Sequence, residues 1–136
     1  MRTSTPTPGR YALDTNVAIA VLNGERVATE HWGAAEAVFL PAPVLAELLV
    51  GARRSARRSE NEREVWRIAE EFGFICCDEE VCRQYAAVKS GLLAVGTPIP
   101  DNDIWVAACC FAAGAVLVSR DNHFDLVGGL VREEWR

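Results

Sequence analysis

The chain has 136 residues, of which 50% are hydrophobic and 24% are charged, and this composition fits one soluble globular domain with a single core. Its apolar runs fall short of the roughly 20 residues that a membrane-spanning helix requires, and the N-terminus lacks an apolar signal core, so we expect a cytoplasmic protein with no membrane partner. The 5 cysteines show no C-x-x-C spacing, which favours reduced core residues over disulfides or a zinc site.

The net charge of −5 argues against a polyanionic partner only if the charge is spread evenly, and it is not. Basic residues are concentrated between positions 53 and 63, at Arg53, Arg54, Arg57, Arg58 and Arg63. Two interpretations of this segment stay open. It is either a solvated helix face whose arginines pair with neighbouring glutamates, or a rim that contacts the phosphate groups of a polyanion.

The predicted elements begin after residues 1–9, a polar segment with two prolines that we expect to be disordered. One domain, residues 10–136, follows. Strands are predicted at residues 10–13, 38–40, 74–77 and 115–118, with a last short strand near residues 130–132. Helices are predicted at residues 17–22, 27–37, 43–50, 59–72, 79–95 and 104–113. This alternation predicts a three-layer α/β/α fold with a central parallel sheet.

Several acidic residues follow strands or begin helices at the same end of this predicted sheet. Asp14 follows the first strand, Asp121 follows the strand at residues 115–118, and Asp103 begins a helix. Glu47 lies about one turn into an apolar helix that we expect to be largely buried. Since right-handed crossovers place the C-terminal ends of all the strands together, the four acids can meet in one pocket.

Clustered carboxylates repel one another, and their pKa values rise unless a cation neutralises them. With no lysine near these acids in the sequence, the cluster indicates a hard divalent ion with oxygen ligands, Mg²⁺ or Mn²⁺. Such a site suits metal-assisted hydrolysis of phosphodiester bonds. Taken singly, each acid has another interpretation, since Asp14 and Asp103 can cap helices, Glu47 can be a structural acid and Asp121 can lie in a turn.

The sequence resembles PIN-domain ribonucleases, specifically VapC-type toxins of type II toxin–antitoxin systems, over roughly residues 11 to 135. Four motifs carry the resemblance, in the family's order. They are Leu13-Asp14-Thr15-Asn16 after the first strand, Glu47 in the helix after the second, Asp103 before Ile104-Trp105-Val106-Ala107-Ala108, and Ser119-Arg120-Asp121 with Phe124 after an apolar strand. The final Gly129-Leu130-Val131 and Trp135 also resemble the family's C-terminus.

The resemblance implies an endoribonuclease whose catalytic metal ligands are Asp14, Glu47, Asp103 and Asp121. It implies that Asn16 and Ser119 orient these carboxylates, and that the protein is a homodimer blocked by a small VapB-like antitoxin. The third motif offers two acids. We favour Asp103 as the ligand because it directly precedes the alanine-rich helix, and we interpret Asp101 as an N-cap or an outer acid of the site.

Two other enzyme classes do not fit the sequence. A phosphatase of the haloacid dehalogenase type requires a second Asp two residues after the first, where this chain has Asn16. A P-loop or dinucleotide site requires a glycine-rich loop after the first strand, which is absent from the sequence. The remaining alternative is a catalytically silent protein-binding module with the same fold.

Overall fold

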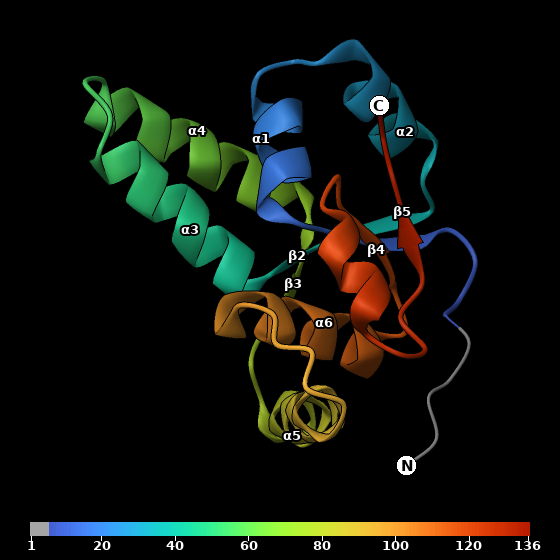
Figure 1. Ribbon diagram of the computed structural model, residues 1–136. Helices are drawn as coiled ribbons and strands as arrows, with labels where there is room; N and C mark the ends of the chain where they lie inside the picture. Colours follow the sequence, from blue (N-terminus) through green and yellow to red (C-terminus); the bar gives the residue numbers. More distant parts are fainter. Residues whose placement is uncertain (1–5) are drawn as a thin grey trace.

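A computed structural model describes residues 6–136, and its centre is a five-stranded parallel sheet in the order β3-β2-β1-β4-β5 (Figure 1). The strands are β1 (Arg10–Leu13), β2 (Ala37–Pro41), β3 (Gly73–Ile75), β4 (Val116–Val118) and β5 (Arg132–Glu133). Because every neighbouring pair is parallel, the C-terminal ends of all five strands lie at one end of the sheet. We call this end the carboxyl end of the sheet.

The central strand, β1, is buried because it pairs with β2 on one side and β4 on the other. Tyr11 aligns with Val38 and with Val116, and the exposed fraction of Ala12 and Leu13 is 0%. A continuous apolar strand of this kind is typical of a parallel sheet that is covered on both faces. The residue that follows β1, Asp14, is therefore delivered to the middle of the carboxyl end.

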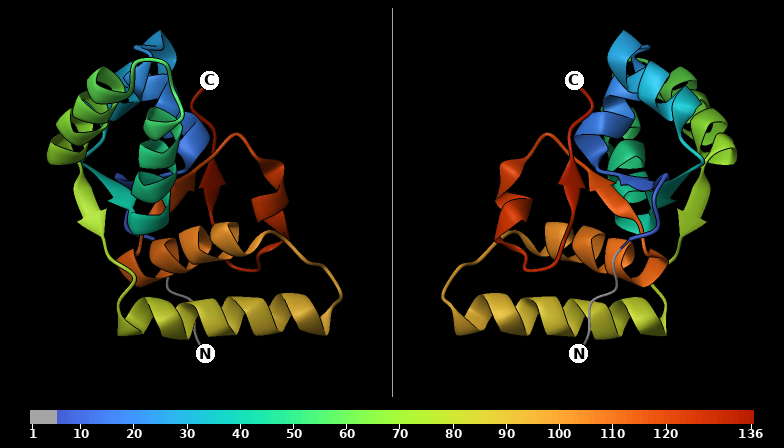
Figure 2. Two further views of the ribbon diagram at one scale, coloured as in Figure 1. Left: turned by 90° about the vertical axis from the view of Figure 1, so that its left-hand side faces the viewer. Right: turned by 90° about the vertical axis from the view of Figure 1, so that its right-hand side faces the viewer.

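The helices form a layer on each side of the sheet (Figures 1 and 2). On one side α6 (Asp101–Ala113) contacts β2 and β4, and α5 (Glu79–Ala94) packs on the outer side of α6. On the other side lie α1 (Thr15–Leu22), α2 (Arg26–Ala34), α3 (Ala42–Arg53) and α4 (Arg58–Glu71), with α3 and α4 paired as a helical hairpin. A short 3₁₀ helix, η1 (Asn122–Leu126), precedes β5. The predicted three-layer α/β/α fold is confirmed.

Local sequence signals explain where several helices begin and end. Pro43 lies in the first turn of α3, where its missing N–H costs no hydrogen bond. The Asp78 carboxylate accepts a hydrogen bond from the Val81 N–H and so caps α5. Gly114 ends α6 with a φ of 62°, a left-handed conformation that glycine adopts without a steric penalty.

Three predictions about burial were wrong. Helix α3 is not largely buried, since its buried residues are Val44, Leu48 and Ala52, and Glu47 is exposed. The apolar positions of the helix predicted at residues 59–72 place Trp66 on its inner side, but Trp66 of α4 is 49% exposed because only one side of the helix hairpin meets the rest of the domain. The cysteines are free, as predicted, but Cys76, Cys77 and Cys82 are exposed and only two lie in the core.

The two ends of the chain also differ from prediction. The predicted disordered segment, residues 1–9, lies partly outside the described residues, but Thr7 donates to the Gly114 carbonyl and Gly9 accepts from the Ala37 N–H. These hydrogen bonds extend the ordered chain to the N-terminal side of β1. The last strand lies about two residues later than predicted. Within residues 6–136, no helix is both long and apolar enough to span a membrane.

Candidate active site

Asp14 lies at the centre of the carboxyl end of the sheet and is only 7% exposed. Its carboxylate accepts a hydrogen bond from the Thr15 N–H at 2.8 Å, which caps α1, and another from the Ser119 hydroxyl at 2.7 Å. Burial raises the pKa of Asp14, the charges of Glu47 and Asp121 raise it further, and the two hydrogen bonds oppose that shift. Asp14 is thus both a helix cap and a buried acid close to other acids.

Ser119 connects the ends of β1 and β4. Its hydroxyl donates to Asp14 and also accepts from the Asp121 N–H at 3.0 Å, so one buried side chain fixes the positions of two acids. An orienting role of Ser119 at a metal site requires such a contact, and the role itself stays a prediction. Asn16 acts differently, because its side-chain oxygen accepts from the Arg120 N–H at 3.3 Å and so holds the loop after β4 against α1.

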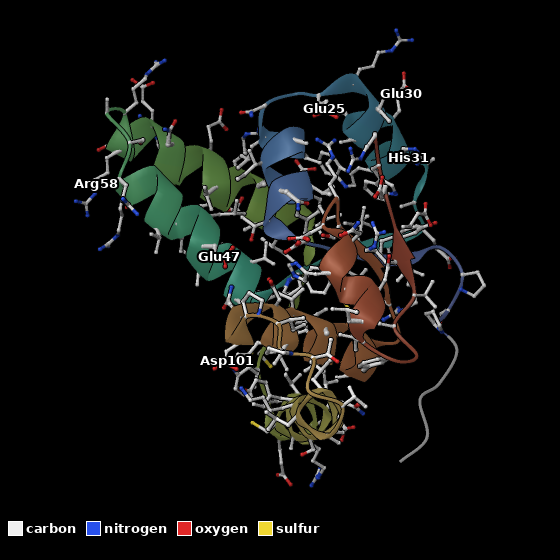
Figure 3. The ribbon with its side chains drawn as sticks, viewed as in Figure 1. Glu25, Glu30, His31, Glu47, Arg58 and Asp101 are labelled. Atoms are coloured by element: carbon white, nitrogen blue, oxygen red, sulfur yellow. The ribbon has the colours of Figure 1, made fainter. Side chains whose placement is uncertain are left out.

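Glu47 reaches the same region from α3, although its side chain is exposed (Figure 3). One carboxylate oxygen accepts a hydrogen bond from the Thr15 hydroxyl and the other accepts from the Asn102 side-chain amide. Residues from α1 and α6 therefore fix the orientation of a glutamate from a third helix. The predicted desolvation of Glu47 does not occur, since α3 presents it to the open end of the sheet.

Asp103 lies in the first turn of α6, and His123 stands between it and Asp121. The His123 Nε2 atom lies 2.7 Å from Asp103 Oδ2, and Nδ1 lies 2.6 Å from Asp121 Oδ1. Burial raises the pKa of Asp103, the charges of Asp14 and Asp121 add to the rise, and His123 lowers it. The structure thus brings Asp103 and Asp121 together through one imidazole ring.

Asp101 has different partners from Asp103, although only one residue separates them in the sequence. Its carboxylate accepts hydrogen bonds from the Lys89 ammonium at 2.6 Å and from the Tyr85 hydroxyl at 3.1 Å, both from α5. Lys89 accordingly holds the pKa of Asp101 below its usual value. The predicted N-cap role is wrong, because Pro100 occupies the cap position and Asp101 is the first helical residue.

The donor chemistry of the four acids fits a hard divalent ion. In residues 6–136, no lysine or arginine forms an ion pair with Asp14, Glu47, Asp103 or Asp121, and the basic side chain beside Asp103 and Asp121 is His123. Burial is the main cause of the raised pKa values of Asp14 and Asp103, and the charges of neighbouring acids add to it. Their side chains do not yet form a closed set of ligands. Among the described residues, no three Asp, Glu, His or Cys side chains converge closely enough to hold a metal.

The arginine-rich segment lies at the far end of the α3–α4 hairpin, as Arg58 and Glu47 show in Figure 3. Arg53 and Arg58 both pair with Glu62, at 3.2 and 3.6 Å, and Arg57 pairs with Glu60. Arg54 and Arg63 form no ion pair within the described part of the chain. Most of the segment therefore has the contacts expected of a solvated helix face.

Sequence reasoning missed three residues that contact the candidate acids: Thr15, Asn102 and His123. Thr15 and Asn102 stand directly beside predicted ligands, and their polarity at the start of a helix was the available signal. His123 had no comparable signal, because its contact with Asp103 depends on how η1 packs against α6. Each of the three fixes the direction of a carboxylate.

Known proteins share this architecture over almost the whole chain. A model of the PIN domain matches residues 11–130. The chain is 25% identical over 130 residues to Ribonuclease VapC1 of Haemophilus influenzae (strain R2866), covering 92% of this chain and 97% of that protein. The structure of VapBC-1 from nontypeable Haemophilus influenzae matches with a TM-score of 0.84 and 25% identity, over 93% and 98% of the two chains. VapBC-5 of Mycobacterium tuberculosis, a member of the VapBC family of toxin-antitoxin systems, matches with a TM-score of 0.72 and 25% identity, over 95% and 99%.

Proposed function

Because the chain belongs to the PIN domain family, we propose that it is a divalent-metal-dependent endoribonuclease and the toxin of a type II toxin–antitoxin system. The resemblance to VapC-type proteins indicated by the four sequence motifs is confirmed. The observation that carries the proposal is the carboxyl end of the sheet, where Asp14, Glu47, Asp103 and Asp121 gather without a lysine or arginine partner among residues 6–136. Mg²⁺ or Mn²⁺ is the cation that this donor set favours.

The ion would be held by these four carboxylates, and the chain supplies contacts that keep the acids in place. Ser119 and the Thr15 N–H hold the two oxygens of Asp14, and they do so without adding positive charge. The Thr15 hydroxyl and Asn102 do the same for Glu47. Oriented carboxylates bind an ion with less reorganisation, because neutral donors fix the side chains and leave the negative charge for the ion.

When bound, a divalent ion would orient a water, lower its pKa and stabilise charge on the scissile phosphate. The chain adds the N-terminal ends of α1 and α6, which both point toward the carboxyl end of the sheet. The partial positive charge of a helix N-terminus stabilises carboxylates and favours an approaching phosphate group. Substrate phosphate and ligand acids thus share a region that has little basic side-chain charge of its own.

We also propose a VapB-like antitoxin as the protein partner. A cavity of about 340 Å³ adjoins Glu47 between α1, α3 and α4, and apolar side chains such as Ile19, Leu22 and Leu48 form much of its wall. A protein segment bound there would lie directly beside the site and block access to it. Expression with and without the neighbouring reading frame tests this, since growth arrest that the second frame does not relieve contradicts the pairing.

We expect the toxin to be a homodimer, and light scattering will measure its mass in solution.

The nuclease proposal is tested by removing single negative charges from the site. Asp14→Asn and Glu47→Gln should each lower Mn²⁺-dependent RNA cleavage about a thousandfold, because each removes a ligand charge while keeping the shape of the side chain. Glu30→Gln is the matched control, since Glu30 lies on α2 and pairs with Arg26 at 2.9 Å. Cleavage at the wild-type rate in Asp14→Asn and Glu47→Gln contradicts the proposal.

The cavity beside Glu47 also favours a second candidate function, a catalytically silent module that binds a protein partner. This candidate predicts the partner complex without metal uptake. Calorimetry with Mn²⁺ separates the two, because the nuclease must bind the ion and Asp14→Asn must weaken that binding. Partner binding with no measurable Mn²⁺ uptake would establish the silent module.

A further inference from the structure

Arg120 lies between two residues of the candidate site, yet the site as proposed above gives it no role. Ser119 precedes it and donates to Asp14, and Asp121, which follows it, is another candidate ligand. Within residues 6–136, the Arg120 side chain forms no hydrogen bond or ion pair with any of the four acids, and it is 25% exposed. Because Arg120 is bonded covalently to both neighbours, the contacts that hold it also restrict where those two site residues lie.

The Arg120 guanidinium joins the loop after β4 to two distant parts of the chain. Its Nη1 atom donates to Glu25 Oε2 at 3.1 Å and its Nη2 atom donates to Glu25 Oε1, so the ion pair is bidentate. Nη2 also donates to the Trp135 carbonyl at 2.7 Å. A bidentate pair of arginine and carboxylate fixes orientation as well as distance. Glu25 directly precedes α2, so the loop is fixed both to that helix and to the C-terminal segment, residues 132–136.

The backbone of the same loop is held by three further side chains. Asn16 of α1 accepts from the Arg120 N–H at 3.3 Å. Arg136 donates to the Arg120 carbonyl at 3.1 Å, and Arg132 donates to the Ser119 carbonyl at 3.0 Å. Two of these three side chains belong to the C-terminal segment, so this segment supports the loop through the backbone as well as through the Arg120 guanidinium.

Trp135 anchors the C-terminal segment to the rest of the domain. Its exposed fraction is 0%, and its ring contacts Tyr11 of β1 edge-on and stacks on His31 of α2, with ring centroids 5.3 Å apart in each pair. The C-terminal segment accordingly ends beside α2 (Figure 1). A buried tryptophan ring contributes a large apolar contact area. The segment is therefore packed firmly enough to support the loop that carries Asp121.

We propose that Arg120 is a positioning residue of the nuclease site, and that its bidentate pair with Glu25 keeps Ser119 and Asp121 in place. The proposal rests on the metal-dependent function proposed above and adds no ligand to the site. Replacing a residue that holds ligands in place without touching the ion typically lowers metal affinity or activity about ten- to hundredfold. A purely structural ion pair would instead change stability alone.

The first test breaks the pair from each side in the full chain. Arg120→Gln removes a positive charge next to Asp121 in the sequence, and Glu25→Gln removes a negative charge. Electrostatics alone would tighten Mn²⁺ binding in the first variant and weaken it in the second. The positioning role predicts that both variants lose about tenfold in Mn²⁺ affinity and in kcat, with the KM for RNA changed less than about threefold. Calorimetry measures the affinity, and steady-state kinetics on one RNA substrate measure kcat and KM.

The second test combines the two changes in one chain. The double variant should lose no more than the more affected single variant, because both changes break one contact. Glu30→Gln is the matched control, since it makes the same substitution on α2, breaks a pair with Arg26 and should leave affinity and kcat unchanged (Figure 3). Ile68→Val, at a buried position of α4, is the control for lost stability. It should lower the unfolding temperature and keep both the affinity and kcat.

Circular dichroism shows whether each variant folds. If Arg120→Gln does not fold, Arg120→Lys replaces it, since lysine keeps the charge and cannot form the bidentate pair. Unchanged or tighter Mn²⁺ binding by the Arg120 variant overturns the positioning role, as do effects that add in full in the double variant. In either case the nuclease proposal stands if the wild type binds Mn²⁺ and Asp14→Asn abolishes that binding and cleavage. A wild type that binds no Mn²⁺ overturns both proposals.

Discussion

Charged side chains have different partners at the carboxyl end of the sheet and at the tip of the α3–α4 hairpin. At the sheet, Asp14 and Asp103 have raised pKa values and are held by neutral donors or by His123. At the hairpin tip, arginines and glutamates pair with one another in solvent, as Arg57 does with Glu60. The acids at the carboxyl end keep negative charge that a bound cation can neutralise, whereas the arginines and glutamates at the hairpin tip neutralise one another.

This difference is informative because the sequence contains many acids and few of them are functional candidates. Exposed ion pairs contribute little to stability, since solvent and salt screen them. Burying carboxylates near one another lowers the free energy of unfolding, and proteins keep such an arrangement where binding of a ligand offsets this loss of stability. Burial close to other acids, without a lysine or arginine partner within residues 6–136, therefore distinguishes Asp14 and Asp103 from the other acids better than acidity alone.

The neighbours Asp101 and Asp103 give this comparison its sharpest test. Asp103→Asn should reduce Mn²⁺-dependent cleavage about a thousandfold, since it removes charge from an acid that has no lysine or arginine partner. Asp101→Asn should leave cleavage within about threefold, because Lys89 already neutralises that carboxylate. Kinetics on one RNA substrate measure both. The reverse order of effects would show that Asp101 is the ligand.

The second prediction concerns stability with and without metal. Asp14→Asn should raise the unfolding temperature in the presence of a chelator, because it removes a buried charge that Glu47 and Asp121 repel. Added Mn²⁺ at a hundredfold excess over its Kd should raise the unfolding temperature of the wild type by about 8 °C and leave Asp14→Asn unchanged. Thermal unfolding with both proteins measures this, and equal Mn²⁺ effects on the two would contradict it.

The sequence predicted most of the fold because the signals that specify it are local. Each strand is an apolar run, and Asp78 and Gly114 mark helix ends through their own hydrogen bonds or backbone conformation. The burial of Glu47 was predicted wrongly for a related reason. An apolar helix pattern does not say which neighbouring element covers each side, and α3 contacts α4, α1, α6 and β2 while the side that carries Glu47 stays exposed.

The candidate site was predictable where its acids follow strands, and less so where its contacts cross the fold. Asp14 and Asp121 are placed by the ends of β1 and β4, which the chain order determines. The contacts of Asn102 with Glu47 and of His123 with Asp103 join residues from different elements. Such contacts depend on helix packing angles, and the sequence pattern does not encode those angles locally.

The third prediction addresses the two open interpretations of the arginine segment. An arginine that contacts RNA phosphate contributes about 0.7 to the slope of log K against log salt for a single strand. Arg54→Ser should lower the slope by that amount if the hairpin tip contacts RNA, because Arg54 forms no ion pair within residues 6–136. Arg57→Ser, which breaks a pair with Glu60, is the control and should change it less. Identical slopes for all three proteins would establish the solvated-face interpretation.

The smallest expected effect concerns Arg132, whose mostly buried side chain joins β5 to η1. Its guanidinium donates to both oxygens of Asp125, at 2.9 and 3.0 Å, and to Glu134 at 2.8 Å, and these contacts hold the pKa values of both acids below their usual range. The pKa of each acid is lower in the folded protein than in the unfolded chain, where it is 3.8 for Asp125 and 4.5 for Glu134. The contacts therefore stabilise the fold fully at pH values above those unfolded pKa values. This stabilisation is lost as the pH falls through the lower pKa values of the folded protein. Arg132→Gln should lower the unfolding temperature slightly at pH 7 and flatten its decline below about pH 4. Arg26→Gln, which breaks an exposed ion pair on α2, is the control and should leave the decline of the unfolding temperature below about pH 4 unchanged. Ion pairs at the surface are screened by solvent, whereas the Arg132 side chain is only 13% exposed.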